Sequence, residues 1–435
     1  MRKSLFSFFL LAASWIAAQE IATDEGALFA DSSQMVDSAS MVRTDTASAP
    51  GAEKKSVGIS GNILALMQGG LMRSYFETPD VAQSSTSGLA VGNAALDVRL
   101  LRGYKAYADL EWMHSGSASA GTGASWRVPE MFLDVNIAHK AYFRAGKQVL
   151  QWGRGYFFNP TDLINVERKT FFRRIGSREG VFGIKTHIPF GTDVNLYGFV
   201  DADGVQRPDS LAGAGKIEFL WGGTEMALMA WKGGDRDPVF GADFSSRVFG
   251  WDVTGEAALY PTFTASRFYF QGVTPIFIKE QKDWTPRAAV GLGRSFDMNG
   301  IPNRLMTVAE YYYNHPGDAR SRVPHPAGFI PGYSPALAMA LLAQSGLYEP
   351  NSYSRHYAAF FATFARFIRS DISLTFNTIG NFNQKCALIS GGMSYRDLND
   401  FSLSLLVNGM AGPDNTEYTF SEQAMQAQII IEAAF

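Results

Sequence analysis

QAQIIIEAAF, from Gln426 to Phe435, is the stretch that decides the fold. From Met425 onward the odd-numbered positions are apolar, whereas polar side chains occupy even-numbered ones at Gln426, Gln428 and Glu432. Alternation with a period of two is typical of a β-strand with one apolar and one polar face. The stretch therefore predicts a strand, either at the edge of a soluble sheet or in a wall between water and an apolar medium.

The other end of the chain has the three parts of a secretory signal in the usual order. Arg2 and Lys3 supply positive charge, LFSFFLLAASWI follows at 5–16, and the small residues Ala17 and Ala18 come next. The apolar core is too short to cross a bilayer, which takes about 20 residues. We therefore expect residues 1–18 to be a signal peptide that is cleaved after Ala18.

Composition excludes several classes of protein. After the signal, the best uncharged apolar run is PALAMALL at 335–342, which is too short for a membrane helix. The single cysteine, Cys386, rules out an intrachain disulfide framework. A net charge of -3 gives no indication of nucleic-acid binding.

The mature chain divides into two parts of different texture. Residues 19–56 are rich in Ala, Ser, Asp and Thr and have almost no aromatic side chains, so they cannot bury enough apolar area to order themselves. We expect them to form a flexible periplasmic extension, with a plug of the barrel lumen or a propeptide as alternatives. From Val57 to Phe435 the sequence consists of alternating segments of about ten residues, as expected for transmembrane strands.

The connectors between these segments alternate between long and short. Long connectors are predicted near 68–90, 114–127, 151–178, 201–212, 232–246, 272–284, 314–354 and 410–421; short ones are predicted at Arg102, Ala138, Pro189, Trp221, Tyr260, Asp297, Arg369 and Arg396. Short periplasmic turns and long outer loops are the asymmetry of an outer-membrane barrel, whereas a soluble sandwich has no reason to keep it. The sequence thus predicts an all-β fold, a transmembrane antiparallel up-and-down β-barrel of about 16–18 strands over residues 57–435, with both termini in the periplasm.

Two features resemble known outer-membrane proteins. A last strand that ends in Phe435 resembles barrels whose insertion machinery reads the final strand, which implies that Phe435 is an assembly signal. The stretch at 146–180 resembles a segment of porin-like outer-membrane proteins over about 20 residues. The matching residues are Gly146, Lys147, Gln148, Trp152, Gly153, Asn159, Pro160 and Asp162.

The same stretch is strongly basic. Between Arg144 and Lys185 nine basic residues face three acidic ones, a local balance of +6 in a chain that is net negative. By analogy with porins in which the third loop folds inward, we predict a constriction that favours anions, because guanidinium groups bind carboxylate and phosphate. Its residues are Arg154, Arg168, Lys169, Arg173, Arg174 and Arg178. The alternatives are lipopolysaccharide binding at the rim and simple ion pairing across the barrel.

Strand parity identifies further side chains that we expect to face the lumen. They are Asp97, Arg99, Lys105, Asp109, Glu111, Lys185, Lys216, Glu218, Asp252, Glu256, Arg304 and Glu310. Both signs of charge occur, so most of them should form ordinary cross-strand pairs in a wet interior.

The sequence gives little support for catalysis. The six histidines lack metal-ligand spacing and no Gly-x-Ser-x-Gly motif occurs, so we expect no enzyme activity, no metal and no cofactor. The expected function is passive diffusion of small polar solutes, including anions, with outer-membrane lipid, lipopolysaccharide and the barrel-insertion machinery as partners and no nucleic acid. The alternatives are an adhesin or secretion-scaffold barrel, and an outer-membrane hydrolase that uses His187 or His356.

Overall fold

The computed structural model describes most of the region predicted to form the barrel. The described residues are 55–72, 84–117, 121–164, 179–203, 211–233, 237–272, 274–323, 350–368, 371–396, 401–419 and 423–434. The predicted signal peptide, nearly all of the predicted extension, and Phe435 lie outside these ranges. Among the helices in these ranges, none is long and apolar enough to cross a membrane.

The described residues form one sheet of nineteen strands and one 3-10 turn, η2 (Leu101–Gly103). The strands are β1 (Ser56–Met72), β2 (Ser84–Arg99), β3 (Lys105–Ser117), β4 (Gly121–Arg127), β5 (Met131–Ile137), β6 (Ala141–Gln148), β7 (Val181–Phe190), β8 (Val194–Asp201), β9 (Ala212–Trp221), β10 (Thr224–Gly233), β11 (Val239–Val248), β12 (Trp251–Gln271), β13 (Thr274–Met298), β14 (Ile301–Asn314), β15 (His356–Phe364), β16 (Ile372–Asn381), β17 (Cys386–Tyr395), β18 (Phe401–Ala411) and β19 (Gln423–Ala434).

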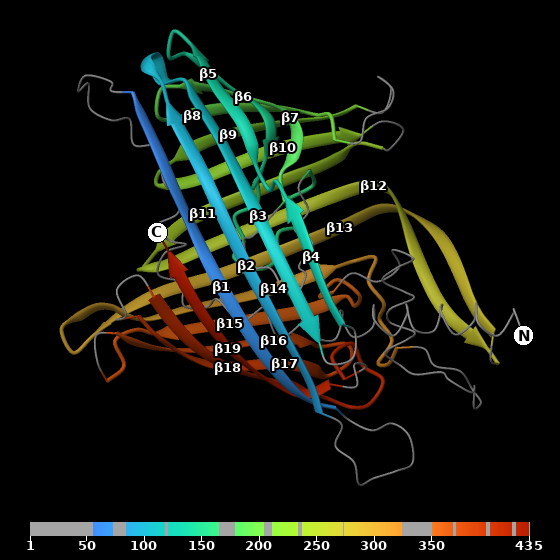
Figure 1. Ribbon diagram of the computed structural model, residues 1–435. Helices are drawn as coiled ribbons and strands as arrows, with labels where there is room; N and C mark the ends of the chain where they lie inside the picture. The colour runs from blue at the N-terminus through green and yellow to red at the C-terminus, as the bar shows by residue number, and fades with distance from the viewer. Residues whose placement is uncertain are drawn as a thin grey trace, which may run out of the picture.

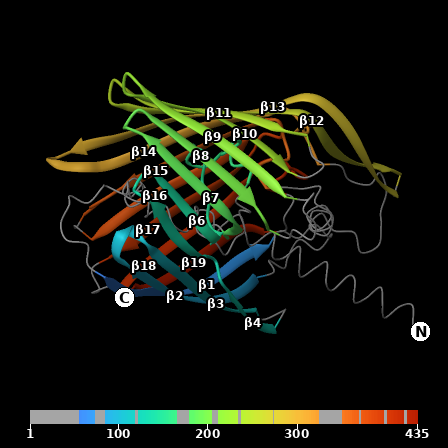
Figure 2. The same ribbon diagram turned by 90° about the horizontal axis from the view of Figure 1, so that it is seen from above.

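The sheet is closed, because β1 pairs with β2 on one side and with β19 on the other (Figures 1 and 2). Every strand pairing is antiparallel, and apart from β1 with β19 and β3 with β5, strands that pair are consecutive in the chain. β4 and β5 pair with different lengths of β3, so together they occupy one position in the wall, and nineteen strands make a barrel of 18. The predicted all-β, antiparallel up-and-down barrel of 16–18 strands is confirmed.

Tight hairpin turns at one end of the barrel join consecutive antiparallel strands. Asn299 and Gly300 have φ values of 54° and 74°, and Phe249 and Gly250 have values of 51° and 77°. Two successive residues with positive φ form the turn whose twist matches that of the flanking antiparallel strands, and Asn and Gly adopt it at low cost. The structure thus has a tight turn inside the predicted connector at Asp297.

The prediction of a turn at Tyr260 is wrong. Tyr260 lies inside β12 and pairs with Thr285 of β13, while Pro261 only interrupts the ladder. The turn lies instead at Phe249–Gly250, and the predicted long connector 232–246 contains most of β11. β12 and β13 also extend past their neighbours as a projecting hairpin (Figure 1).

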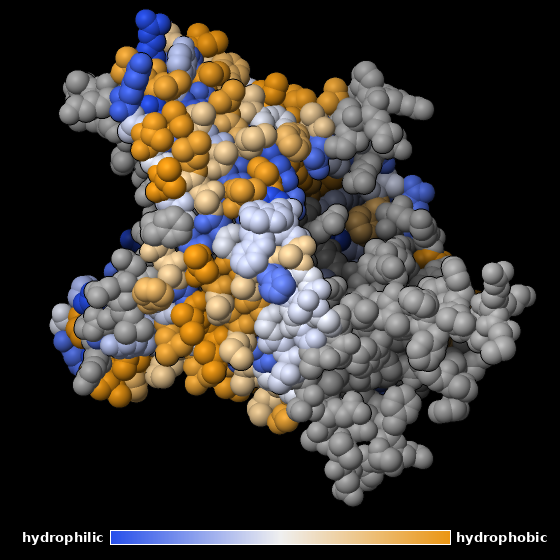
Figure 3. Space-filling model, viewed as in Figure 1, coloured by the Kyte–Doolittle hydropathy of each residue, from blue (hydrophilic) through white to orange (hydrophobic). Residues whose placement is uncertain are grey.

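The outer face of the wall is apolar. Along β1, Ile63 and Met67 are 56% and 71% exposed, whereas the alternate residues Leu66 and Gln68 are 6% and 8% exposed. The same parity exposes apolar side chains in the other strands, and Figure 3 shows such side chains gathered over the strands of one face. An apolar band of this extent is typical of contact with lipid hydrocarbon.

Candidate functional site

A length of chain between β6 and β7 lies against the inner face of the barrel. We call residues 149–164 the inner segment. It follows Gln148, whose side chain is fully buried and donates to the carbonyl oxygen of Gly183 at 3.2 Å. The inner segment contacts side chains of β9, β10, β11, β12, β14 and β15, which are successive strands of a closed wall apart from β13, so it lies inside that wall.

Two wall carboxylates hold the backbone of the inner segment. Glu310 of β14 accepts hydrogen bonds from the backbone N–H groups of Phe157 and Phe158 at 2.8 and 3.0 Å. Glu256 of β12 accepts from the N–H of Gly155 and, at 2.7 Å, from the hydroxyl of Thr161. Both carboxylates are only 4% exposed, so these hydrogen bonds satisfy acceptor oxygens that water cannot reach.

Glycine is required where the segment approaches these carboxylates. A Cβ added at Gly155 would lie 2.2 Å from the carbonyl oxygen of Phe158, and one added at Gly153 would lie 2.8 Å from Glu256 Oε2. Asp162 also accepts from the N–H of Gly153 at 2.8 Å. Gly153 and Asp162, two residues of the stretch that resembles porin-like proteins, therefore determine the backbone path of this segment.

Arg154 is the one predicted constriction residue that the structure describes. Its guanidinium contacts three carboxylates, those of Asp243 at 2.6 Å, Glu218 at 2.8 Å and Glu225. Burial opposes its charge, but the hydrogen bonds and charges of the three carboxylates, with Asp243 contributing most, together outweigh burial and raise the pKa of Arg154 above its usual value. With Lys216, 3.2 Å from Asp243, this carboxylate cluster has two positive and three negative groups, a balance of -1.

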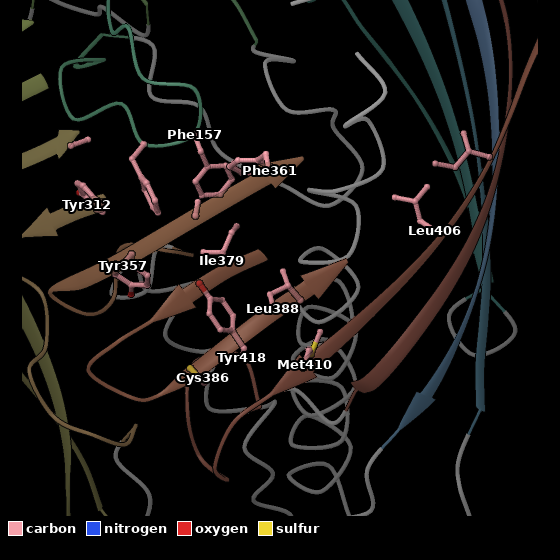
Figure 4. Packing of buried hydrophobic residues seen from close by; sticks show 14 of the residues in the cluster. Phe157, Tyr312, Tyr357, Phe361, Ile379, Cys386, Leu388, Leu406, Met410 and Tyr418 are labelled. Carbon is pink, nitrogen blue, oxygen red and sulfur yellow. The ribbon is translucent and has the colours of Figure 1, made fainter. Parts of the chain in front are cut away.

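The middle of the inner segment packs into an aromatic cluster. Phe157 is fully buried and packs edge-on against Phe158 at 4.8 Å, and it also meets Phe361 of β15 at 5.5 Å. Phe158 stacks on Tyr312 of β14 at 4.8 Å. Figure 4 shows Phe157, Tyr312 and Phe361 converging from the segment and the wall. The segment is thus held by hydrogen bonds to its backbone and by apolar burial of Phe157 and Phe158.

Of the predicted lumen residues, Lys216, Glu218, Glu256 and Glu310 come together around the inner segment. Others lie elsewhere in the wall, and several are paired. Their placements are as follows: Asp97 contacts Arg99 and Lys105, both at 3.2 Å; Glu111 pairs with Arg127; Asp252 pairs with Arg247 at 2.7 Å; Asp109 lies half-buried beside Glu130; Lys185 lies opposite Arg144; and Arg304 donates to the carbonyl oxygens of Arg366 and Phe367. Arg168, Lys169, Arg173, Arg174 and Arg178 lie outside the described residues.

Sequence reasoning missed two partners of Arg154. Asp243 was not predicted to face the lumen, because residues 232–246 were predicted to be a connector. The apolar residues Phe240, Ala242 and Phe244 nevertheless occupy the alternate positions around it, as in a strand. Glu225 follows a short turn, and no pattern in the neighbouring sequence indicates that its side chain faces the lumen.

A second buried group fixes long connectors beside β15 and β16. Glu417, in the connector after β18, accepts from the hydroxyl of Tyr357 and the amide of Asn381, both at 2.8 Å, and from the N–H of Asn351 at 3.0 Å. Its own N–H donates to Gln384 at 2.6 Å. All five residues are at most 3% exposed, so this connector is fastened to β15 and β16.

The inner wall therefore has two parts of different character. β2 to β14, the charged wall, carry the acidic and basic residues described above. β15 to β19 together with β1, the neutral wall, contain one charged residue, Glu432, which accepts from Asn62 at 2.9 Å. The inner segment is anchored mainly to the charged wall and touches the neutral wall at Phe361.

Solved porin structures share this architecture. The chain is similar to OccK9 (OpdG) of Pseudomonas aeruginosa, with a TM-score of 0.52 and 7% identity over 87% of this chain and 98% of that one. It is also similar to a BenF-like porin of Pseudomonas fluorescens Pf-5, with a TM-score of 0.50 and 9% identity over 87% and 98% of the two chains. The fold is that of an outer-membrane porin. No family model matches the porin-like chain, and no curated protein matches it by sequence.

Proposed function

We propose that this porin-like barrel is a passive outer-membrane channel for small polar solutes. The observation that carries the proposal is the inner segment, which Glu256 and Glu310 hold inside a closed wall. A rigid segment inside a barrel narrows the passage, so that size and polarity decide which solutes cross. The predicted lumen residues, in particular the paired groups of the charged wall, line this passage in our proposal.

The proposal includes an orientation in the membrane. The end with the short turns, where β1 begins and β19 ends, faces the periplasm, and the opposite end faces lipopolysaccharide. In this arrangement the insertion machinery reads the last strand and Phe435. The inner segment then enters the barrel from the outer side.

The direct test is single-channel recording of the purified protein in a planar bilayer. Steady conductance steps support a channel, and retarded passage of larger neutral solutes in liposome swelling supports a narrowed one. A folded protein that gives no steps would favour an adhesin or secretion scaffold instead.

A hydrolase has weaker support. His187 Nε2 lies 2.9 Å from Asn195 Oδ1, and His356 Nδ1 lies 2.6 Å from the hydroxyl of Tyr311. Neither contact is the His–Asp or His–Ser pairing that activates a nucleophile or a water.

We assign any preference for anions to the basic residues of 165–178. Arg154 is compensated by three carboxylates, so the predicted constriction depends on Arg168, Lys169, Arg173, Arg174 and Arg178. Charge in a narrow passage acts more strongly than at the rim, where the Debye length is about 8 Å at physiological salt. Replacing Arg173 and Arg174 with Gln should shift the reversal potential in a salt gradient toward cations, more so at low salt. An unchanged potential with altered sensitivity to divalent chelators would place these residues at the lipopolysaccharide rim.

A further inference from the structure

The neutral wall carries a row of uncharged polar side chains at one level. Asn377, Ser390, Asn408 and Gln426 are successive cross-strand partners in β16, β17, β18 and β19, and we call them the amide ladder. They have the same parity as Phe361, which pairs with Asn377 and contacts the inner segment, so all four face the interior. Neighbouring strands lie about 4.8 Å apart, so the ladder is about 14 Å long.

Most of the ladder has unused hydrogen-bonding capacity. Each of the four side chains is at most 1% exposed. Within the part of the chain that the structure describes, Asn377 and Asn408 have no partner for either Nδ2 or Oδ1, and Ser390 Oγ has none. Gln426 differs, because its Nε2 donates to Gln68 Oε1 at 2.7 Å, although its Oε1 is unpartnered. Buried polar groups of native proteins are nearly always hydrogen-bonded, so these atoms call for a ligand.

The chemistry of the ladder defines what such a ligand must be. A primary amide offers a donor and an acceptor side by side, which matches the hydroxyl groups of a polyol, each both donor and acceptor. The ladder contains no charged residue that would attract or repel an ion. By strand parity, apolar side chains flank it on the same face, with Leu388 and Met410 on one side and Leu406 on the other. Such side chains suit the C–H faces of a sugar ring.

We propose that the amide ladder is a binding site for neutral carbohydrates, which pass along the neutral wall. The ladder is longer than one sugar ring, so it fits short oligosaccharides better than monosaccharides. The inference rests on the proposed channel function and names the solute class that this side of the channel takes.

The test measures block of the ion current by raffinose, a neutral trisaccharide, in planar bilayers. We expect saturable block of the unaltered protein, because bound sugar obstructs ion flow. Replacing Asn377 and Asn408 with Leu removes the amides at similar volume and should raise the dissociation constant for raffinose about tenfold or more, since several hydrogen bonds are lost. Conductance without sugar should stay close to that of the unaltered protein. Ser402→Ala, on the inner face of β18 but away from the ladder, is the control and should leave the block unchanged.

The other outcomes of these recordings contradict either the carbohydrate site or the channel function. Steady conductance that raffinose does not block, or equal block of the Leu variant, overturns the carbohydrate site and leaves the channel standing. No conductance in any form of the protein overturns the proposed function itself. If the Leu variant does not fold, Asn408→Ser keeps a shorter polar group there, and it should weaken the block by a smaller factor. Unchanged block with a loss of heat stability in Asn408→Ser would show that the amides pair within the chain, and the carbohydrate site fails.

Discussion

The charged wall and the neutral wall belong to one continuous sheet, yet their buried polar side chains differ in whether they have hydrogen-bond partners. In the charged wall, Glu256 and Glu310 are buried because backbone N–H groups of the inner segment satisfy them. In the neutral wall, Asn377 and Asn408 are equally buried, and their amides have no such partner in the described residues. The charges that the inner segment contacts thus serve to hold a second piece of backbone, whereas these two amides hold no described backbone.

This difference changes how charge in the lumen should be interpreted. Arg154 alone would indicate an anion site, but with its neighbours the local balance is -1. A buried charge is tolerated only when its partners satisfy it, so the number of charged residues says little about how solutes are selected. The comparison predicts that removing charges near the inner segment alters stability first, and that effects fade with distance from it.

The largest effect should come from Glu310→Ala. It removes the acceptor for the N–H groups of Phe157 and Phe158, and charge-assisted bonds of this kind contribute about 1.5–3 kcal/mol each. We expect a loss of several kcal/mol in stability and larger, noisier conductance steps as the inner segment is released. Heat-modifiability on gels and single-channel recordings measure the two effects.

The matched control is Glu432→Ala, since Glu432 is the charged residue of the neutral wall and accepts from Asn62. It should change both readouts far less than Glu310→Ala. If the two variants behave alike, the carboxylates of the charged wall have no special role as anchors and the comparison fails.

Arg154→Gln should have the second largest effect. It leaves Asp243, which is buried, with Lys216 as its remaining cation, and takes the balance of the carboxylate cluster from -1 to -2. Breaking a well-buried ion pair costs about 3 kcal/mol, and the 17% exposure of Arg154 reduces this somewhat. We expect a lower melting temperature and a reversal potential shifted toward cations. A shifted reversal potential at an unchanged melting temperature would mean that Arg154 controls ion selectivity more than it anchors the inner segment.

Gly155→Ala should have an intermediate effect that does not involve charge. The added methyl group would lie 2.2 Å from the carbonyl oxygen of Phe158, so the inner segment must shift away from Glu256. Overpacking of this kind costs about 1–3 kcal/mol. Gly391→Ala is the control, because nothing lies within 4 Å of a Cβ at Gly391 in the neutral wall. Thermal denaturation should separate the two variants, and equal melting temperatures would count against a close-fitting segment.

The sequence predicted the strands of the barrel wall better than the inner segment and its contacts with the wall. Alternation identified the barrel, because lipid and water impose opposite demands on successive residues of a strand. Pro261 was mistaken for the end of a strand, since a proline at a gap in the ladder has the same local pattern as one in a turn. The role of Glu310 was not predictable, because its partner Tyr156 lies 154 residues away and offers only a backbone N–H, which leaves no trace in side-chain type.

The smallest effect should come from the pair of Arg247 and Asp252, at the short-turn end of the charged wall. Their atoms lie 2.7 Å apart, closer than Arg154 and Glu218 at 2.8 Å, but the side chains are 74% and 48% exposed. An ion pair in water is screened and loses side-chain entropy, so Arg247→Gln should cost less than about 0.5 kcal/mol. It makes the same change of charge as Arg154→Gln. If it lowers the melting temperature or shifts the reversal potential as much as Arg154→Gln does, then charge alone matters, and proximity to the inner segment does not distinguish one part of the wall from another.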